Sequence, residues 1–166
     1  SPDNKLLASG GFRTVKLWRK PDPVKALDFA GLETAVRSLA TSADGKWAAI
    51  GEENGKIRVF EVATGKIAKT LEGHTSPTTG VVFSADGTKL VSGSQDKTFR
   101  VWNVADQKEL AKIETPAPVN AVALVAEGKT VATGGADNII RLYALPEATP
   151  TEAPKPLFEL TGHGGP

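Results

Sequence analysis

Residues 73–103 read GHTSPTTGVVFSADGTKLVSGSQDKTFRVWN, and this stretch decides the fold. It contains three short runs rich in β-branched and aromatic residues, which end near Phe83, Ser92 and Trp102. A Ser-Ala-Asp-Gly turn separates the first two runs, and Asp-Gly tolerates the positive φ that a tight hairpin requires. The stretch therefore predicts a meander of three antiparallel strands.

The same pattern recurs along the chain at intervals of about 41 or 42 residues. Copies of the turn lie at 1–4, 42–45 and 84–87, with a weaker copy at 125–128. We predict second strands at 6–9, 47–50, 89–92 and 129–133, and fourth strands at 24–29, 66–71, 109–113 and 156–160. The whole chain, 1–166, is interpreted as one domain with repeats at about 1–30, 31–72, 73–114 and 115–166.

The third strand of every repeat ends in an aromatic residue: Trp18, Phe60, Trp102 and Tyr143. Apolar and basic residues alternate before it, so we expect one face of each strand to be buried. The basic residues that face the other way are Lys16, Arg58, Arg100 and Arg141.

Composition limits the possible partners. The net charge is +1 and charged residues are interspersed, which indicates neither a nucleic acid nor an acidic membrane surface as partner. The chain has no cysteine, so disulfides and thiolate metal sites are excluded. No apolar run approaches the ~18 residues that a membrane-spanning helix needs.

The period, the four strands per unit, the Gly-His before the first strand and the aromatic at the end of the third resemble the WD40 family of β-propellers. The resemblance covers essentially the whole chain. It implies an all-β propeller of four-stranded antiparallel blades, about four per chain. The strict Trp-Asp dipeptide is replaced by Trp18-Arg19, Phe60-Glu61, Trp102-Asn103 and Tyr143-Ala144.

The resemblance also implies a buried hydrogen-bonded chain of four side chains within a blade. One repeat can supply all four of them, namely His74, Ser92, Asp96 and Trp102. In other repeats the histidine position holds Leu32 or Thr115, and the serine position holds Ile50. The turn position of Asp96 is kept by Asn54 and Asp137.

Three functional interpretations of these residues compete with a structural one. His74, Ser92 and Asp96 could form a hydrolase triad, but Ser92 lies in an apolar strand and a structural network is favoured. A metal site at His74 and His163 would lack further clustered ligands. Gly10-Gly11 and Gly134-Gly135 lack the strand-to-helix context of a phosphate loop, so we interpret them as turns. We predict no catalytic, cofactor-binding or metal-binding residue.

The proline-rich segment 146–156 is predicted to be a solvated loop insertion, with an aromatic-groove ligand as the alternative. Aligned on the repeat, the chain holds three strands of one blade, three complete blades and a linker to a further first strand. Four blades would make half of an eight-bladed ring, so we expect a twofold homodimer that closes it. We also expect a half-propeller that is either engineered or cut from a natural protein.

The predicted function is a non-catalytic scaffold for protein interaction. The resemblance implies a partner protein or peptide on the face built from the loops before the first strand and between the second and third. By position that face contains Arg37, Thr79, Asn120, Glu53, Gln95 and Phe12. The alternative is the propeller portion of a larger enzyme or of a signalling or redox protein. The sequence does not indicate a compartment, and a cytoplasmic one is expected only for a natural intracellular protein.

Overall fold

The computed structural model describes residues 6–11, 14–19, 27–125, 128–146 and 154–162. The first sheet contains β1 (Leu6–Gly11), β2 (Thr14–Arg19) and β3 (Leu27–Asp28). The second contains β4 (Val36–Thr41), β5 (Trp47–Glu52), β6 (Ile57–Glu61) and β7 (Lys66–Leu71). The third contains β8 (Thr78–Phe83), β9 (Lys89–Ser94), β10 (Thr98–Asn103) and β11 (Lys108–Glu114). The fourth contains β12 (Val119–Val125), β13 (Thr130–Gly135), β14 (Ile140–Ala144) and β15 (Phe158–Leu160).

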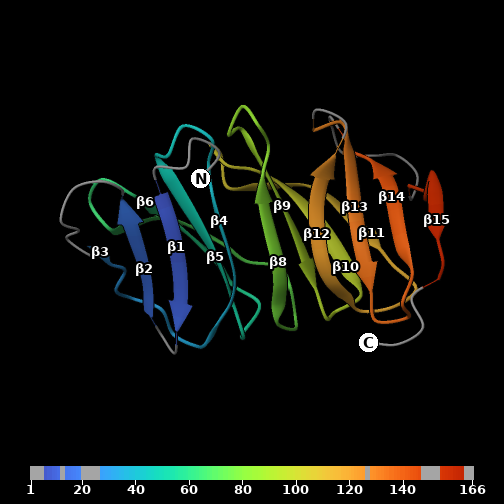
Figure 1. Ribbon diagram of the computed structural model, residues 1–166, viewed down its shortest axis with the longest axis horizontal. Helices are drawn as coiled ribbons and strands as arrows, with labels where there is room; N and C mark the ends of the chain where they lie inside the picture. Colours follow the sequence, from blue (N-terminus) through green and yellow to red (C-terminus); the bar gives the residue numbers. More distant parts are fainter. Residues whose placement is uncertain (1–5, 12–13, 20–26, 126–127, 147–153, 163–166) are drawn as a thin grey trace.

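Each four-stranded sheet is an antiparallel meander whose strands lie in chain order. The sheets stand side by side along the molecule (Figure 1), and the first strands β4, β8 and β12 pack next to one another. This arrangement confirms the predicted all-β fold with four-stranded antiparallel blades. The described residues include no helix, and hence none that could span a membrane.

The second strands extend further than the sequence predicts, because each also includes the glycine or glycines that follow its predicted end. Gly10-Gly11 and Gly134-Gly135 end β1 and β13, so their interpretation as turns is wrong. Gly93, at the equivalent position in β9, shows the physical reason. A Cβ on Gly93 would lie 2.6 Å from Val119 Cγ1 and 2.7 Å from Val122 Cγ1 in the next sheet. Glycine at this position allows neighbouring sheets to approach closely.

The Ser-Ala-Asp-Gly turns close through their own side chains. Ser84 Oγ donates to Asp86 Oδ1 at 2.5 Å and accepts a bond from the Lys89 N–H at 2.9 Å. Ser42 makes the same pair of bonds in the second sheet. Gly87 has a φ of 70°, which is the left-handed conformation that the sequence predicted for this position.

The fourth strands of the outer sheets differ from the prediction at the ends that the structure describes. Only β3 (Leu27–Asp28) represents the predicted strand 24–29, whose first three residues lie outside the described chain. Strand β15 begins at Phe158 rather than Pro156, which has no N–H to donate to a ladder. Most of the proline-rich segment, 147–153, also lies outside the described residues.

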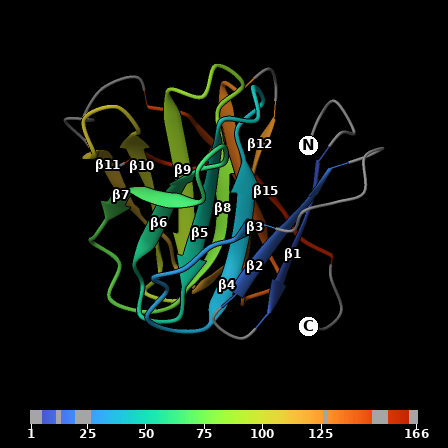
Figure 2. The same cartoon turned by 90° about the vertical axis from the view of Figure 1, so that its left-hand side faces the viewer.

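The hydrophobic core consists of three separate clusters, each between two neighbouring sheets. Val15 of the first sheet and Phe29, which follows β3, pack against Ile50 and Phe60 of the second sheet. Figure 2 views the ribbon from the side of the first sheet. The seam between the second and third sheets includes Ile57, Val59, Leu71, Leu90 and Trp102, and the next seam includes Phe99, Val101, Ile113, Val131 and Tyr143. The inner sheets therefore bury both faces, as propeller blades do.

Candidate functional site

Four side chains of the third sheet form a continuous hydrogen-bonded chain. Trp102 Nε1 on β10 donates to Ser92 Oγ on β9 at 2.8 Å. Ser92 Oγ lies 2.8 Å from His74 Nε2, and His74 Nδ1 lies 2.9 Å from Asp96 Oδ2. The structure thus brings together the four residues that the sequence singled out.

The donors in this chain can be assigned from its two ends. The indole of Trp102 can only donate, and an ionised Asp96 can only accept. His74 therefore donates from Nδ1 to Asp96, and its Nε2 accepts the hydroxyl proton of Ser92. Burial lowers the pKa of His74, although its bond to Asp96 opposes this effect. Burial alone would raise the pKa of Asp96, but bonds from Thr98 and His74 lower it below its usual value.

Asp96, His74 and Ser92 are hydrogen-bonded in the order of a hydrolase triad, but a substrate cannot reach the serine. Ser92 is 0% exposed, and its oxygen already accepts the Trp102 N–H while its proton is directed to His74. A substrate carbonyl cannot approach a hydroxyl that is enclosed in this way. The geometry supports a structural network that links the turn after β9 to the centre of the blade.

The buried neutral histidine makes stability depend on pH. We expect the free energy of unfolding to decrease as the pH falls below 6.5, the ordinary pKa of histidine. Between that value and the lowered pKa of folded His74, the unfolded chain binds a proton that the folded chain does not, which favours unfolding. Denaturant titrations at about pH 8 and about pH 5.5 measure the difference, which should be smaller in His74→Gln. The wild-type protein and the His74→Gln variant both contain His163, so a difference between them reports on His74. An equal pH dependence of the two proteins would contradict this prediction.

The second sheet replaces the histidine network with a buried carboxylate that the sequence analysis missed. Glu52, at the end of β5, is 0% exposed. Its Oε2 accepts bonds from the N–H groups of Glu33 at 2.9 Å and Thr34 at 3.0 Å. Its Oε1 accepts a bond from Arg58 Nε at 2.9 Å. Glu52 thus accepts hydrogen bonds from the backbone N–H groups before β4. In the third sheet Asp96 has the corresponding role, because it accepts the Thr75 N–H.

The hydrogen-bonded serine and tryptophan of the third sheet are also replaced in the second sheet, by apolar side chains. Ile50 and Phe60 stand at the register positions of Ser92 and Trp102, and both are fully buried. The sequence offers one sign of this replacement, because Glu52 stands at the strand end where the next repeat has Ser94. That sign predicts a buried carboxylate only if the strand end is known to be buried.

Two arginines of the third strands are buried and pair with acidic side chains of their own sheets. Arg100 and Arg141 are 9% and 5% exposed. Arg141 pairs with Asp137 Oδ2 and Glu159 Oε1, both at 2.8 Å, and Arg100 pairs with Glu109. The predicted alternation holds, but the faces that carry Arg100 and Arg141 are buried. The side chain of Lys16 is outside the described part of the chain.

Three of the predicted partner-contacting residues share one structural position. Arg37, Thr79 and Asn120 are each the extra residue of a β-bulge in the first strand of a sheet. A bulge breaks the alternation of a strand and directs a side chain away from the ladder. Arg37 and Asn120 are exposed, whereas Thr79 is partly buried and donates to Val119 O of the next sheet at 2.5 Å.

The adjacent turns are held to these strands by equivalent backbone bonds. The N–H groups of Glu53, Gln95 and Ala136 donate to the residues just before β4, β8 and β12, at 2.9, 3.1 and 2.8 Å. The bulges and turns therefore form one repeated surface, which we call the loop face: Arg37, Glu53, Thr79, Gln95, Asn120 and Ala136. Arg37 forms an ion pair with Glu53, and Gln95 is exposed. Phe12 lies outside the described residues.

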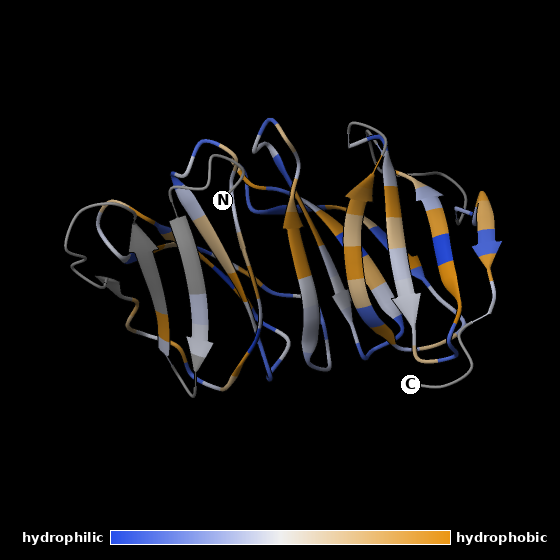
Figure 3. Ribbon diagram, in the orientation of Figure 1, coloured by the Kyte–Doolittle hydropathy of each residue, from blue (hydrophilic) through white to orange (hydrophobic). Residues whose placement is uncertain are grey.

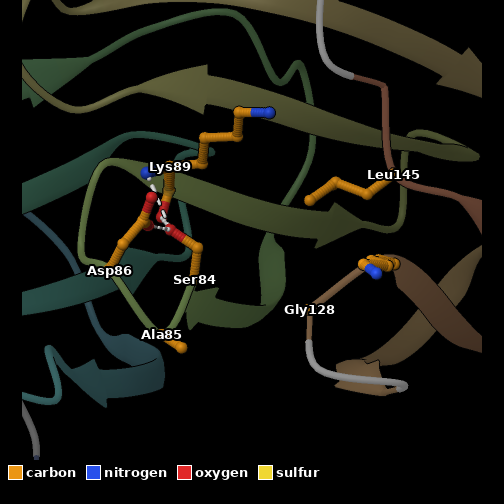
Figure 4. Close-up of a pocket in the computed structure, with 7 residues that line it drawn as sticks. Ser84, Ala85, Asp86, Lys89, Gly128 and Leu145 are labelled. Carbon is orange, nitrogen blue, oxygen red and sulfur yellow. Dashed lines mark hydrogen bonds between the residues drawn. The ribbon is translucent and has the colours of Figure 1, made fainter.

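A cavity of about 430 Å³ lies among the turns on the opposite face of the molecule (Figure 4). Its charged lining residues are Asp86, Lys89 and Lys129. Hydrogen bonds from the Ser84 hydroxyl and from Thr88 lower the pKa of Asp86 to about 2. Lys89 Nζ donates to the backbone carbonyl of Pro146 at 3.4 Å, so the lining carries two cationic side chains and one carboxylate. Within the described chain, no three His, Asp or Glu side chains lie close enough to hold a metal ion.

Comparison with known families agrees with this architecture. A model described as WD domain, G-beta repeat, matches residues 65–103 and 107–144. A second, the anaphase-promoting complex subunit 4 WD40 domain, matches residues 15–79.

Several characterised proteins are similar in sequence. Transcription factor unc-37 of Caenorhabditis elegans is 31% identical over 141 residues, which are 85% of this chain and 23% of that protein. The Poly(A)+ RNA export protein of Schizosaccharomyces pombe is 32% identical, over 71% of this chain and 35% of its own length. Eukaryotic translation initiation factor 3 subunit I of Culex quinquefasciatus is 32% identical, over 63% of this chain and 32% of its own. The chain thus spans only about a quarter to a third of each of these relatives. With its four-stranded blades and the two matching repeat models, the chain belongs to the WD40-repeat family of β-propeller proteins.

Proposed function

We propose that this chain is a non-catalytic WD40 scaffold that binds a protein or peptide partner on its loop face. WD40 domains generally mediate protein–protein interactions, and the similar proteins carry names from transcription, RNA export and translation initiation. These names describe proteins much longer than this chain. A place within a larger signalling or redox protein therefore remains the second candidate.

The observation that supports the loop face is its repetition. In three successive sheets, a bulge residue and a turn residue are held in the same relation by an equivalent backbone bond. The side chains at these positions differ from sheet to sheet: a charged pair in the second, threonine and glutamine in the third, asparagine and alanine in the fourth. A rigid frame with variable side chains is suited to selective recognition.

A display selection tests the loop face. Peptides that bind the wild-type chain are measured against Arg37→Glu/Gln95→Lys and against a matched pair on the opposite face, Lys46→Glu/Asp106→Lys. All four residues are exposed, so both variants should fold. Loss of binding by about tenfold or more in the first variant alone is expected. Equal losses, or a loss only in the second, would reject this face.

We also propose that two copies form a closed ring through the faces of their end blades. In the third sheet, Val101 and Ile113 are 0% and 1% exposed because the fourth sheet covers them. Their register equivalents in the fourth sheet are Leu142 and Leu160, and Leu160 is 55% exposed. Phe158, which pairs with Leu142, is 66% exposed. The apolar strand β15 lies at the outer end of the molecule (Figure 3).

In the first sheet of a second copy, the residues at the contact positions correspond to those of the third sheet that meet the second sheet. Within the seam between the second and third sheets, Ile57, Val59 and Leu71 meet Leu90 and Trp102. Leu7 and Trp18 pair in the first sheet at the positions of Leu90 and Trp102. A contact between the fourth sheet of one copy and the first sheet of another would therefore repeat the kind of seam that joins neighbouring sheets within each chain.

Sedimentation equilibrium tests the ring. Two chains of 17.4 kDa should give a mass of about 35 kDa at micromolar concentration. Phe158→Glu/Leu160→Glu should shift the mass to that of the monomer, whereas Lys108→Glu, an exposed control on β11, should not. A wild-type monomer, or a dimer unaffected by the β15 changes, would refute this assembly.

A further inference from the structure

The cavity of about 430 Å³ lies at a corner between the third and fourth sheets, on the face opposite the loop face (Figure 4). The third repeat lines it with Lys89 and the turn residues 84–86. The fourth repeat lines it with Gly128, Lys129 and Leu145. Its volume is within the range of protein sites that bind small molecules.

Lys89 stands where the second sheet has a tryptophan. The Ser84 N–H donates to Lys89 O across its turn, and the Ser42 N–H donates to Trp47 O in the same way, both at 2.9 Å. Trp47 is partly buried and packs against the hydrophobic cluster between the second and third sheets. At the cavity, a cationic side chain therefore replaces the indole ring that packs at the equivalent position one sheet earlier.

The turns on the other side of the corner also differ. Gly87 and Gly128 are equivalent, because the N–H of each closes its turn and both have a positive φ, 70° and 82°. A Cβ on Gly87 would lie 3.9 Å from Ser42 Cβ of the second repeat. No atom of the described residues lies within 4 Å of a Cβ on Gly128. The contact that closes the earlier corner is thus not made by the described residues at the cavity.

One wall of the cavity is apolar. Leu145 packs against the cluster of buried side chains between the third and fourth sheets. Its backbone bond corresponds to that of Val104, which belongs to the cluster that Trp47 packs against. Both corners therefore offer an aliphatic wall to a flat ring. We call the earlier one the filled corner: Ser42, Trp47, Gly87 and Val104.

The charges that line the cavity are positive on balance. Lys89 and Lys129 contribute two ammonium groups, and Asp86 contributes one carboxylate. That carboxylate accepts bonds from the Ser84 hydroxyl and from the N–H and hydroxyl of Thr88, all within its own turn. An anionic group that enters the cavity is therefore attracted by the two lysines.

We propose that this cavity binds a small aromatic carboxylate, in which a flat ring carries a short acidic side chain. The ring packs against Leu145 and the alkyl part of Lys89, as the indole of Trp47 packs in the filled corner. The carboxylate pairs with the ammonium groups of Lys89 and Lys129. Asp86 and Lys129 are exposed, so the ligand can enter from solvent.

The site is independent of the two proposals made for the function of the chain. It lies on the opposite face from the loop face, and it is formed between two sheets of one chain. Failure of the partner or of the dimer would therefore leave it unaffected, and its own failure would leave both of them standing.

Calorimetric titration of the full chain with indole-3-propionate tests the site. This compound joins the ring of tryptophan to a carboxylate. We expect saturable binding of one molecule per chain, which weakens as the salt concentration rises. Tryptamine has the same ring but a cationic side chain and should not bind. Propionate lacks the ring and should bind at least about tenfold more weakly.

Two equivalent lysines provide a matched pair of variants. Lys129→Met removes a charge from the cavity and should weaken binding of indole-3-propionate by about tenfold. Lys46→Met removes the same charge beside the filled corner and should bind as wild type does. Both lysines are exposed, so both variants should unfold at the denaturant concentration of wild type.

Lys89→Trp gives the cavity the residue of the filled corner. Its indole would occupy the place of the ligand, so this variant should not bind indole-3-propionate. Since Trp47 is accepted at the equivalent position, the free energy of unfolding should not decrease. Lys89→Met keeps a long apolar side chain without the charge and should bind about tenfold more weakly than wild type.

The inference is overturned if indole-3-propionate does not bind, if tryptamine binds equally, or if Lys129→Met and Lys89→Trp bind as tightly as wild type. An equal loss of binding in Lys46→Met would also overturn it, because the effect would then come from net charge alone. If Lys89→Trp does not fold, the comparison of Lys129→Met with Lys46→Met decides the outcome.

Discussion

Alanine at position 52 is expected to lower the free energy of unfolding by about 3 kcal/mol. Glu52 is fully buried, and its two oxygens accept bonds from the Glu33 and Thr34 N–H groups and from Arg58. Removal of the carboxylate leaves these donors without their buried acceptor, and Arg58 keeps only Glu33 and Thr70 as partners. Urea titration, monitored by tryptophan fluorescence, gives the change in unfolding free energy.

The adjacent glutamate is the control for Glu52. Glu53 is partly exposed and pairs with Arg37 at the surface, so Glu53→Ala should lower the free energy of unfolding far less than Glu52→Ala does. Glu52→Gln keeps one oxygen acceptor but lacks the charge, and it should fall between the two. If Glu52→Ala and Glu53→Ala have equal effects, the buried network does not stabilise the second sheet.

Trp102→Ala should lower the free energy of unfolding by about 4 kcal/mol. Trp102 is 2% exposed, packs in the seam between the second and third sheets, and donates to Ser92. Its ring also lies 6.0 Å from the Arg100 guanidinium. The variant therefore loses packing in a seam, a buried hydrogen bond and a cation–π contact together. Thermal or urea unfolding measures the total loss.

Trp102→Phe separates the hydrogen bond from the packing. Phenylalanine fills most of the site but cannot donate to Ser92, so a loss of about 1 kcal/mol is expected for the bond, plus the cost of the smaller ring. Combined with Ser92→Ala in a double-mutant cycle, the coupling between the two residues isolates the bond. A coupling near zero would mean that Trp102 stabilises the seam by packing alone.

Several elements of the site could be predicted because their signals are local. The turns 42–45 and 84–87 contain their own serine, aspartate and glycine, and all the bonds that close them lie within six residues. The hydrogen-bonded chain of the third sheet was expected from the resemblance to the WD40 family, because one repeat contains His74, Ser92, Asp96 and Trp102. The alignment of repeats also located Arg37, Thr79 and Asn120 at one equivalent position, although not its character as a β-bulge.

Other elements depend on residues far apart in the sequence. Glu52 is separated from Glu33 by 19 residues, and nothing in its immediate neighbours indicates that the end of β5 is buried. The need for glycine at position 93 comes from the side chains of Val119 and Val122 in the next sheet. Arg100 and Arg141 are buried although alternation alone would leave their face to solvent, and Arg141 pairs with Glu159, 18 residues away.

The sequence by itself determined the all-β class, the number of strands in each repeat and the one repeat able to form the complete histidine network. Alternation, turn chemistry and an internal period are properties of neighbouring residues, so they can be read without a fold. The tertiary structure decided which faces are covered: Leu71 and Ile113 are buried while Leu160 is exposed. The reason is physical, since burial in this fold is created between sheets, and the same residue type is core or surface according to whether another blade lies against it.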